Sequence, residues 1–217
     1  MGSEASGARS SSATKRLTGE ERRERLLDVA ATLFADRGYR STTMDDVAEA
    51  AGVTKPVVYQ HFESKRALYL ELVDALAYEL LTAFADVTAS AQGPRDLVER
   101  SLQAYFRLMV EDQAAFRLLT DRDHGDDEDL GRAVRRVEQA LVVAIDPLID
   151  AGLDAEHRIV LAGGMLGMAE GASIAWMTRR SSTKASLTAT QLQDEADLMA
   201  RRVAELMWAG LRSVHSD

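Results

Sequence analysis

The sequence predicts an all-α protein, and three observations support this class. Apolar residues recur at helical spacing along most of the 217 residues. Helix-capping signals repeat along the chain, beginning with the capping box Thr18-Gly19-Glu20-Glu21. We find no run of alternating apolar and polar residues long enough for a strand. These patterns favour helices arranged in two parts, a short N-terminal unit and a larger unit behind it.

Three helices are expected in the N-terminal unit. The first follows the Thr18 capping box and stops near residue 38. The second, MDDVAEAA, follows Thr43 and ends at Gly52, because the position after a helix suits a left-handed glycine. The third follows Thr54 and carries Pro56 in its first turn, where backbone N–H groups lack helical partners anyway. A helix, a tight turn and a second helix form the arrangement called a helix-turn-helix.

Six more helices are expected in the second unit. They begin after Ser64, at Pro94, after Asp112, near Leu130, after Asp154 and after Thr188. Pro147 should bend or end the helix that starts near Leu130. We therefore predict a flexible basic arm over 1–17, a helix-turn-helix domain over 18–63 and a six-helix domain over 64–217.

The bulk composition limits the function. Net charge is −9, but residues 1–66 carry a balance of +1 and residues 67–217 carry −10. A polyanion partner therefore suits only the N-terminal part. There is no cysteine, which fits a reducing compartment, and the opening MGSEASGARSSSATKR lacks the apolar core of a secretory signal. We expect a cytoplasmic protein.

The third helix, in GVTKPVVYQHFESK, raises the functional question. Val58 and Phe62 lie four apart and form one buried face, which leaves polar and aromatic side chains outside. DNA contacts are predicted for Thr43, Thr54, Lys55, Pro56, Val57, Tyr59, Gln60, His61 and Lys65. Gln60 suits a base edge and Val57 a thymine methyl, while the basic and hydroxyl groups suit phosphates. An ordinary hairpin with a solvated face has the same spacing.

A longer stretch resembles a known family. Residues 26–73 are similar to the DNA-binding domain of the TetR family of transcriptional regulators through A..LFA.RGY, TT..D.A..AGV and K..VYQHF.SK..L. Pro56 stands where glycine is also common in that family. The resemblance implies a two-domain homodimer that binds a near-palindromic double-stranded DNA operator. It also implies a small-molecule effector that changes the spacing of two DNA-reading heads, most often releasing a repressor.

Two later helices carry patterns suited to pairing. Leu192, Ala196, Met199, Val203, Leu206 and Gly210 repeat at spacings of four and three, while Gly163, Gly167 and Gly171 lie four apart. Both patterns also fit burial within one subunit. The resemblance favours a dimer interface, because the family pairs through its last two helices. We predict interface positions at Gly163, Gly167, Gly171, Leu192, Met199, Val203 and Leu206.

An effector site is predicted from large, adaptable side chains in the second unit. The candidate residues are Tyr105, Met109, Phe116, Arg122, Met165, Met168 and Trp176. Aromatic and methionine stripes also fit a plain core. Arg122 or His124 could anchor an acidic ligand. The acidic loop 121–129 does not follow the order of a calcium loop, so we expect no metal.

Two other classes of protein fit the sequence less well. Residues 159–177 are apolar over about the length that crosses a bilayer, but Glu170 inside the segment favours a buried helix and no membrane partner. The sequence carries no cysteine nucleophile, phosphate-binding glycine loop or HExxH motif, so we expect neither an enzyme nor a cofactor. The alternative to a DNA-binding regulator is a helical adaptor whose basic hairpin binds a protein partner.

Overall fold

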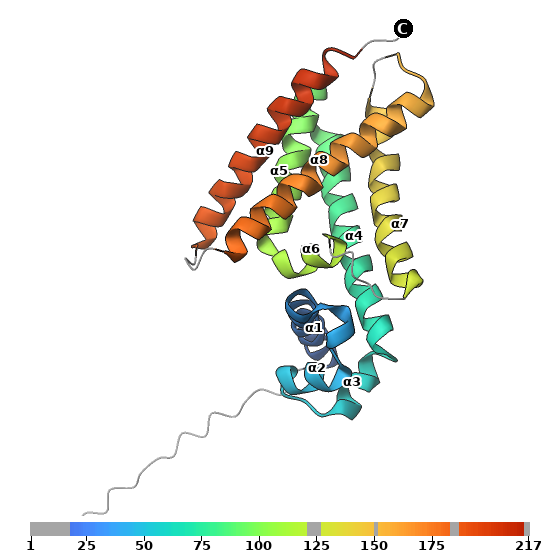
Figure 1. Cartoon of the computed structure of the whole chain (residues 1–217), viewed down its shortest axis with the longest axis vertical. Coiled ribbons are helices and arrows are strands. Elements are labelled where there is room, and N and C mark those ends of the chain that lie inside the picture. Colours follow the sequence, from blue (N-terminus) through green and yellow to red (C-terminus); the bar gives the residue numbers. More distant parts are fainter. Residues whose placement is uncertain (1–17, 121–126, 150–151, 183–186, 215–217) are drawn as a thin grey trace, which may run out of the picture.

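The computed structural model describes residues 18–120, 127–149, 152–182 and 187–214, and within these ranges the chain is helical without a strand (Figure 1). The helices are α1 Gly19–Ser41, α2 Met44–Ala51, α3 Lys55–His61, α4 Lys65–Ser90, α5 Pro94–Glu111, α6 Gln113–Thr120, α7 Glu128–Ile145, α8 Ala155–Ser181 and α9 Ala189–Leu211. The all-α prediction is confirmed. The predicted arm 1–17 lies outside the described residues.

Helix starts follow the capping signals. Thr18, Thr43 and Thr188 each form a complete capping box with the residue three positions later. Thr54 precedes α3 as expected, but its side chain makes no capping hydrogen bond. Pro147 ends α7, because the chain passes after Ile145 into a 3-10 turn over Asp146–Leu148.

The first helix is longer than its glycine signal predicts. Gly38 has φ 78° and kinks the backbone, yet helical residues continue to Ser41. The left-handed conformation suits glycine, so the kink falls where a side chain would be strained. The Thr42 hydroxyl donates to the carbonyls of Leu33 and Gly38, at 3.2 and 3.0 Å, and so satisfies acceptors on both sides of the kink.

Helices α1, α2 and α3 enclose a small core. Phe34, Val47, Val58 and Phe62 are buried there, as the helix-turn-helix pattern predicts. Burying a large apolar side chain contributes about 1.5–3 kcal/mol, so a few such residues account for much of a small unit's cohesion. In Figure 1 this unit lies below the other six helices, and α4 runs from it into them.

The six-helix part surrounds a second core. Helix α5 packs between α4 and α9, while α7 lies against α4 and α8. Phe106, Met109, Leu130 and Ala196 are fully buried in it. An ion pair between Arg107 and Asp197, with 3.0 Å between Nε and Oδ1, ties α5 to α9 at the surface.

Helix α6 and the first turns of α4 join the two parts. The rings of Phe34, Tyr39 and Tyr69 meet with centroids 5.2–5.7 Å apart. The buried Tyr69 hydroxyl donates to the Leu118 carbonyl of α6 at 3.0 Å. An ion pair between Arg117 and Asp36, 3.8 Å apart, links α6 to α1 at the surface. The N-terminal unit is therefore anchored on α6.

We predict that Tyr69→Phe lowers the free energy of unfolding by about 1–3 kcal/mol, because a buried carbonyl loses its donor. Tyr78→Phe is the matched control, since Tyr78 is 73% exposed and should change stability by less than about 0.5 kcal/mol. Urea unfolding followed by circular dichroism measures both. Equal effects of the two substitutions would contradict a structural role for the Tyr69 hydroxyl.

Candidate nucleic-acid interface and ligand cavity

One side of α3, the candidate recognition helix, packs against the rest of the N-terminal unit. Val58 and Phe62 are buried against the N-terminal core. The Arg23 guanidinium lies 4.8 Å from the Phe62 ring centroid and forms a two-pronged ion pair with Glu71 of α4. Arg23 thus fixes the end of α3 against the start of α4, since a fork-shaped pair restricts orientation.

The outward face of α3 is open. Tyr59 and Gln60 are exposed, while Val57 and His61 are half-buried. Neither Tyr59 nor Gln60 has a hydrogen-bonding partner within the described ranges, apart from backbone bonds of the helix. The face therefore presents an amide, a phenol and a methyl-bearing side chain to a partner.

Lys55 stands at the start of this face. Its ammonium lies 3.0 Å from Asp45 Oδ2 of α2, and this hydrogen bond raises the pKa of Lys55. Both side chains are exposed, so the pair contributes little and a phosphate can compete for the ammonium. Lys55 remains available as an anion-binding group.

Three predicted contacts lie beside the turn. The Thr43 hydroxyl accepts from the Asp46 backbone and donates to the Asp46 carboxylate, so it is engaged in capping. Thr54 and Pro56 are both exposed. The Thr54 hydroxyl makes no capping bond, which leaves it available for an outside acceptor.

Lys65 has a different environment from the one expected of a phosphate contact. Its ammonium donates to the carbonyls of Tyr39 and Thr42 at 2.7 and 2.8 Å and lies 4.3 Å from the Tyr39 ring centroid. Partial burial lowers its pKa. These contacts satisfy carbonyls at the end of α1, so the geometry favours a structural role for Lys65 over phosphate binding.

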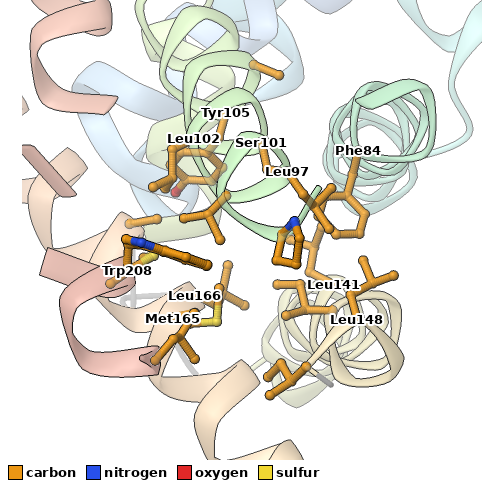
Figure 2. Close-up of a pocket in the computed structure, with 18 of the residues that line it drawn as sticks. Phe84, Leu97, Ser101, Leu102, Tyr105, Leu141, Leu148, Met165, Leu166 and Trp208 are labelled. Atoms are coloured by element: carbon orange, nitrogen blue, oxygen red, sulfur yellow. The ribbon is translucent and has the colours of Figure 1, made fainter. Parts of the chain in front are cut away.

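A cavity of about 270 Å³ opens among α4, α5, α7, α8 and α9 (Figure 2). Its wall is formed by Leu80, Ala83, Phe84, Pro94, Leu97, Val98, Ser101, Leu102, Ala104, Tyr105, Leu141, Ile145, Leu148, Ile149, Met165, Leu166, Ala169, Met207, Trp208, Leu211 and Arg212. Trp208 and Met165 lie on the side opposite Phe84 (Figure 2). The lining is almost wholly apolar.

The wall has few polar groups. Burial raises the pKa of the Tyr105 phenol, while a hydrogen bond with Ser173 opposes that shift. The Ser101 hydroxyl is shielded from water and has no partner in the described part of the chain. An apolar ligand therefore fits the wall better than a strongly polar one.

Two of the seven predicted effector residues, Tyr105 and Met165, line this cavity. Met109, Phe116 and Trp176 are instead buried in the core, and Met168 packs beside it. Phe116 reaches only a small side chamber next to Tyr105. Arg122 lies outside the described residues.

Four notable wall residues were not predicted from the sequence: Phe84, Leu97, Trp208 and Arg212. Phe84 and Leu97 flank the break at QGP, and Trp208 and Arg212 end the last helix. A helical pattern shows which side chains share a face but not which helices meet. Phe84 and Trp208 are large aromatic side chains of the kind that line ligand pockets, and this residue type is the one signal that could have found them.

The structure exposes some residues of the predicted dimer interface and packs others against their own chain. Gly163, Gly167 and Gly171 are exposed along α8, and an added Cβ at each would meet nothing within 4 Å. Leu206 on α9 is also exposed, at 64%. Leu192, Met199 and Val203 instead pack against the core of their own chain. For these three residues, the geometry favours the alternative of burial within one subunit.

Helix α8 keeps an exposed apolar stripe. Val160 is 67% exposed and Ile174 is 45% exposed, and the three glycines lie between them on the same side. Among the described residues, α8 is also the one helix long and apolar enough by composition to cross a membrane. Contacts with α7 and α9 pack the other side of α8 against the helical bundle.

Within the described ranges, no group of three or more His, Asp or Glu side chains is arranged to hold a metal ion. Asp127 and Asp129 form ion pairs with Arg66 of α4. The described end of the acidic loop therefore serves to fasten α7 to the base of α4.

Several known proteins are similar to this chain. Residues 26–72 match the bacterial regulatory proteins of the tetR family. The chain is 31% identical over 164 residues to the HTH-type transcriptional activator FasR of Mycolicibacterium smegmatis, covering 75% of both chains. It is 34% identical over 100 residues to the HTH-type transcriptional repressor KstR2 of Rhodococcus jostii, a match spanning about half of each chain.

A solved structure agrees in fold. The transcriptional regulator FadR from Bacillus subtilis, in complex with stearoyl-CoA, superposes with a TM-score of 0.68 at 13% identity. The match covers 88% of this chain and 99% of that one. The matched helix-turn-helix segment, the relative aligned over three quarters of the chain and the nine-helix order of the described residues show that the chain belongs to the TetR family of DNA-binding transcriptional regulators.

Proposed function

We propose that this chain is a homodimeric, cytoplasmic repressor, released from a near-palindromic operator by a small apolar effector. The observation that carries the proposal is α3, which is buried on one side and open on the other. A helix held in this way fits a major groove with its exposed side chains toward the bases. Family membership favours DNA over the protein partner of an adaptor.

Base reading is assigned to Gln60 and Val57. An exposed amide can form two hydrogen bonds with adenine, and an apolar methyl can contact thymine. Lys55, Thr54, Tyr59 and His61 surround them, with donors suited to phosphate oxygens. Such contacts set the position of the helix without reading sequence.

Dimerisation is assigned to the exposed stripe of α8. An apolar stripe with glycines allows close approach of a second helix, and burying it removes apolar surface from water. A two-fold dimer through this stripe presents two copies of α3. The operator should then contain two related half-sites.

Effector coupling is assigned to α6. The Tyr105 ring in the cavity wall meets the Phe116 ring of α6, with centroids 5.3 Å apart. The next residues of α6 contact the N-terminal unit through the Arg117–Asp36 ion pair and hold α4 through the Tyr69–Leu118 hydrogen bond. A ligand that displaces Tyr105 therefore acts on the anchor of the reading head. The stearoyl-CoA complex of the Bacillus subtilis FadR supports an effector with an apolar body.

The first prediction here concerns base reading. Gln60→Ala should weaken operator binding by about 1–3 kcal/mol and weaken binding to scrambled DNA much less. Gln139→Ala is the control, because Gln139 is exposed on α7, far from α3 in sequence. Fluorescence anisotropy with both DNAs measures the difference. An equal loss on operator and scrambled DNA would show that Gln60 does not read bases.

The second prediction separates two lysines by the salt dependence of DNA binding. Lys55→Met should reduce the slope of log affinity against log salt by about 0.9 per head, because one phosphate contact is lost. Lys65→Met should leave that slope unchanged and lower thermal stability, since its ammonium caps α1. A reduced slope for Lys65→Met with unchanged stability would restore Lys65 as a phosphate contact.

The third prediction concerns assembly. Val160→Glu should convert the dimer to monomer, because it places a charge in an apolar interface. Val143→Glu is the control, since Val143 is similarly exposed but lies on α7. Sedimentation velocity at micromolar concentration distinguishes the two forms. A monomeric unaltered protein, or dissociation by both variants, would argue against the α8 interface.

A further inference from the structure

One charged side chain lines the cavity. Among the described residues that line it, Arg212 is the single charged side chain, and all but a few of the others are apolar. Arg212 ends α9 and keeps helical backbone angles, so it lies one turn beyond Trp208 on the same face. Its side chain is exposed. The charge therefore stands at the mouth of the cavity.

The mouth continues into an open trough. The trough is lined by Gln92, Gly93, Pro94, Arg95, Asp96, Glu99 and Trp208 and holds about 420 Å³. It shares Pro94 and Trp208 with the cavity. A polar end of a ligand near Pro94 and Trp208 would therefore lie beside this open surface.

The other charges near the mouth are already paired. Arg95 binds Glu99, with 2.7 Å between Nε and Oε1. Asp96 accepts from the Gln92 backbone at 2.8 Å and lies 3.6 Å from Arg100. Arg212 forms no ion pair within the ranges that the structure describes. Among the described residues around the mouth, Arg212 is the cation without a recorded carboxylate partner.

We propose that the effector is an anionic amphiphile whose carboxylate or phosphate head binds Arg212, with its apolar body in the cavity. The inference rests on the proposed function and specifies its ligand. A guanidinium binds such heads through paired hydrogen bonds. A cationic head at the same place meets like charge, and a neutral head gains no charge-assisted bond.

The cavity sets the size of the body. Its volume of about 270 Å³ holds roughly nine groups of about 30 Å³, the share of a water molecule in the liquid. A methylene is close to that size. A chain of about ten carbons therefore fills the cavity and leaves its head at the mouth.

Four probes share a ten-carbon chain and differ in the charge of their head group: decanoate, decyl phosphate, decan-1-ol and decylamine. They test whether the site prefers an anionic head group. Isothermal titration calorimetry on the 217-residue chain gives their affinities, and tryptophan fluorescence of a Trp176→Phe variant, in which Trp208 is the remaining tryptophan, reports occupancy of the wall. We expect at least one anionic probe to bind about 10-fold or more tightly than decanol, as a charged hydrogen bond implies. Decylamine should bind more weakly than decanol. Decanoate and decyl phosphate distinguish the two kinds of head.

Arg212→Gln should abolish the preference for the anionic probes and leave decanol binding unchanged. Arg136→Gln is the matched control, because Arg136 is exposed on α7 and lines neither the cavity nor the trough. It should keep the full preference. Equal affinities of decanol and both anions, an unaltered preference in Arg212→Gln, or no binding of any probe would overturn the proposal.

Operator binding with each probe separates this inference from the proposed function. Release of DNA by the anionic probes, lost in Arg212→Gln, supports both. Tight binding of the anions in a chain that binds no DNA contradicts the proposed function and upholds the head contact. Release of DNA by decanol as effectively as by decanoate contradicts the role of Arg212 and upholds the regulator.

Discussion

The proposed DNA-reading surface depends on one constraint: the buried side of the seven-residue helix α3 is packed against the N-terminal core. A helix as short as α3 is not stable alone in water, because too few hydrogen bonds offset the cost of its first turn. Val58 and Phe62 hold it from within, and Arg23 fixes its end through Phe62 and Glu71. With that side fixed, the outward side chains have defined positions. Base reading by Gln60 and Val57, as proposed, depends on these fixed positions.

Under the proposed function, the same constraint links the distant cavity to DNA binding. The reading head rests on the first turns of α4 and on α6, and both helices continue into the six-helix part. Lys65 and Arg117 contact the reading head, and the Tyr69 hydroxyl joins α4 to α6. A ligand changes DNA affinity only by its different affinity for two head positions. Under the proposed coupling, such a difference would first arise at the Tyr105–Phe116 contact.

Local signals predicted the helices well, because capping depends on neighbouring residues. Thr18, Thr43 and Thr188 start their helices as expected, and the glycine signal failed only at Gly38, where a kink replaced an end. The outward face of α3 was predictable from period alone. The structural role of Lys65 was not predictable in this way, since the carbonyls it binds lie at the end of another helix. The cavity was predicted only through Tyr105 and Met165, because its wall depends on which of five helices meet.

The central claim is that two copies of α3 read one DNA site. Selection from a random-sequence DNA library, using the unaltered 217-residue chain, tests it most directly, because such a library requires no chosen target gene. We expect enrichment of near-palindromic sites whose half-sites lie about one helical turn apart or a multiple of it, because a two-fold dimer presents two recognition helices. Enrichment of no sequence over the starting library at physiological salt would contradict the claim.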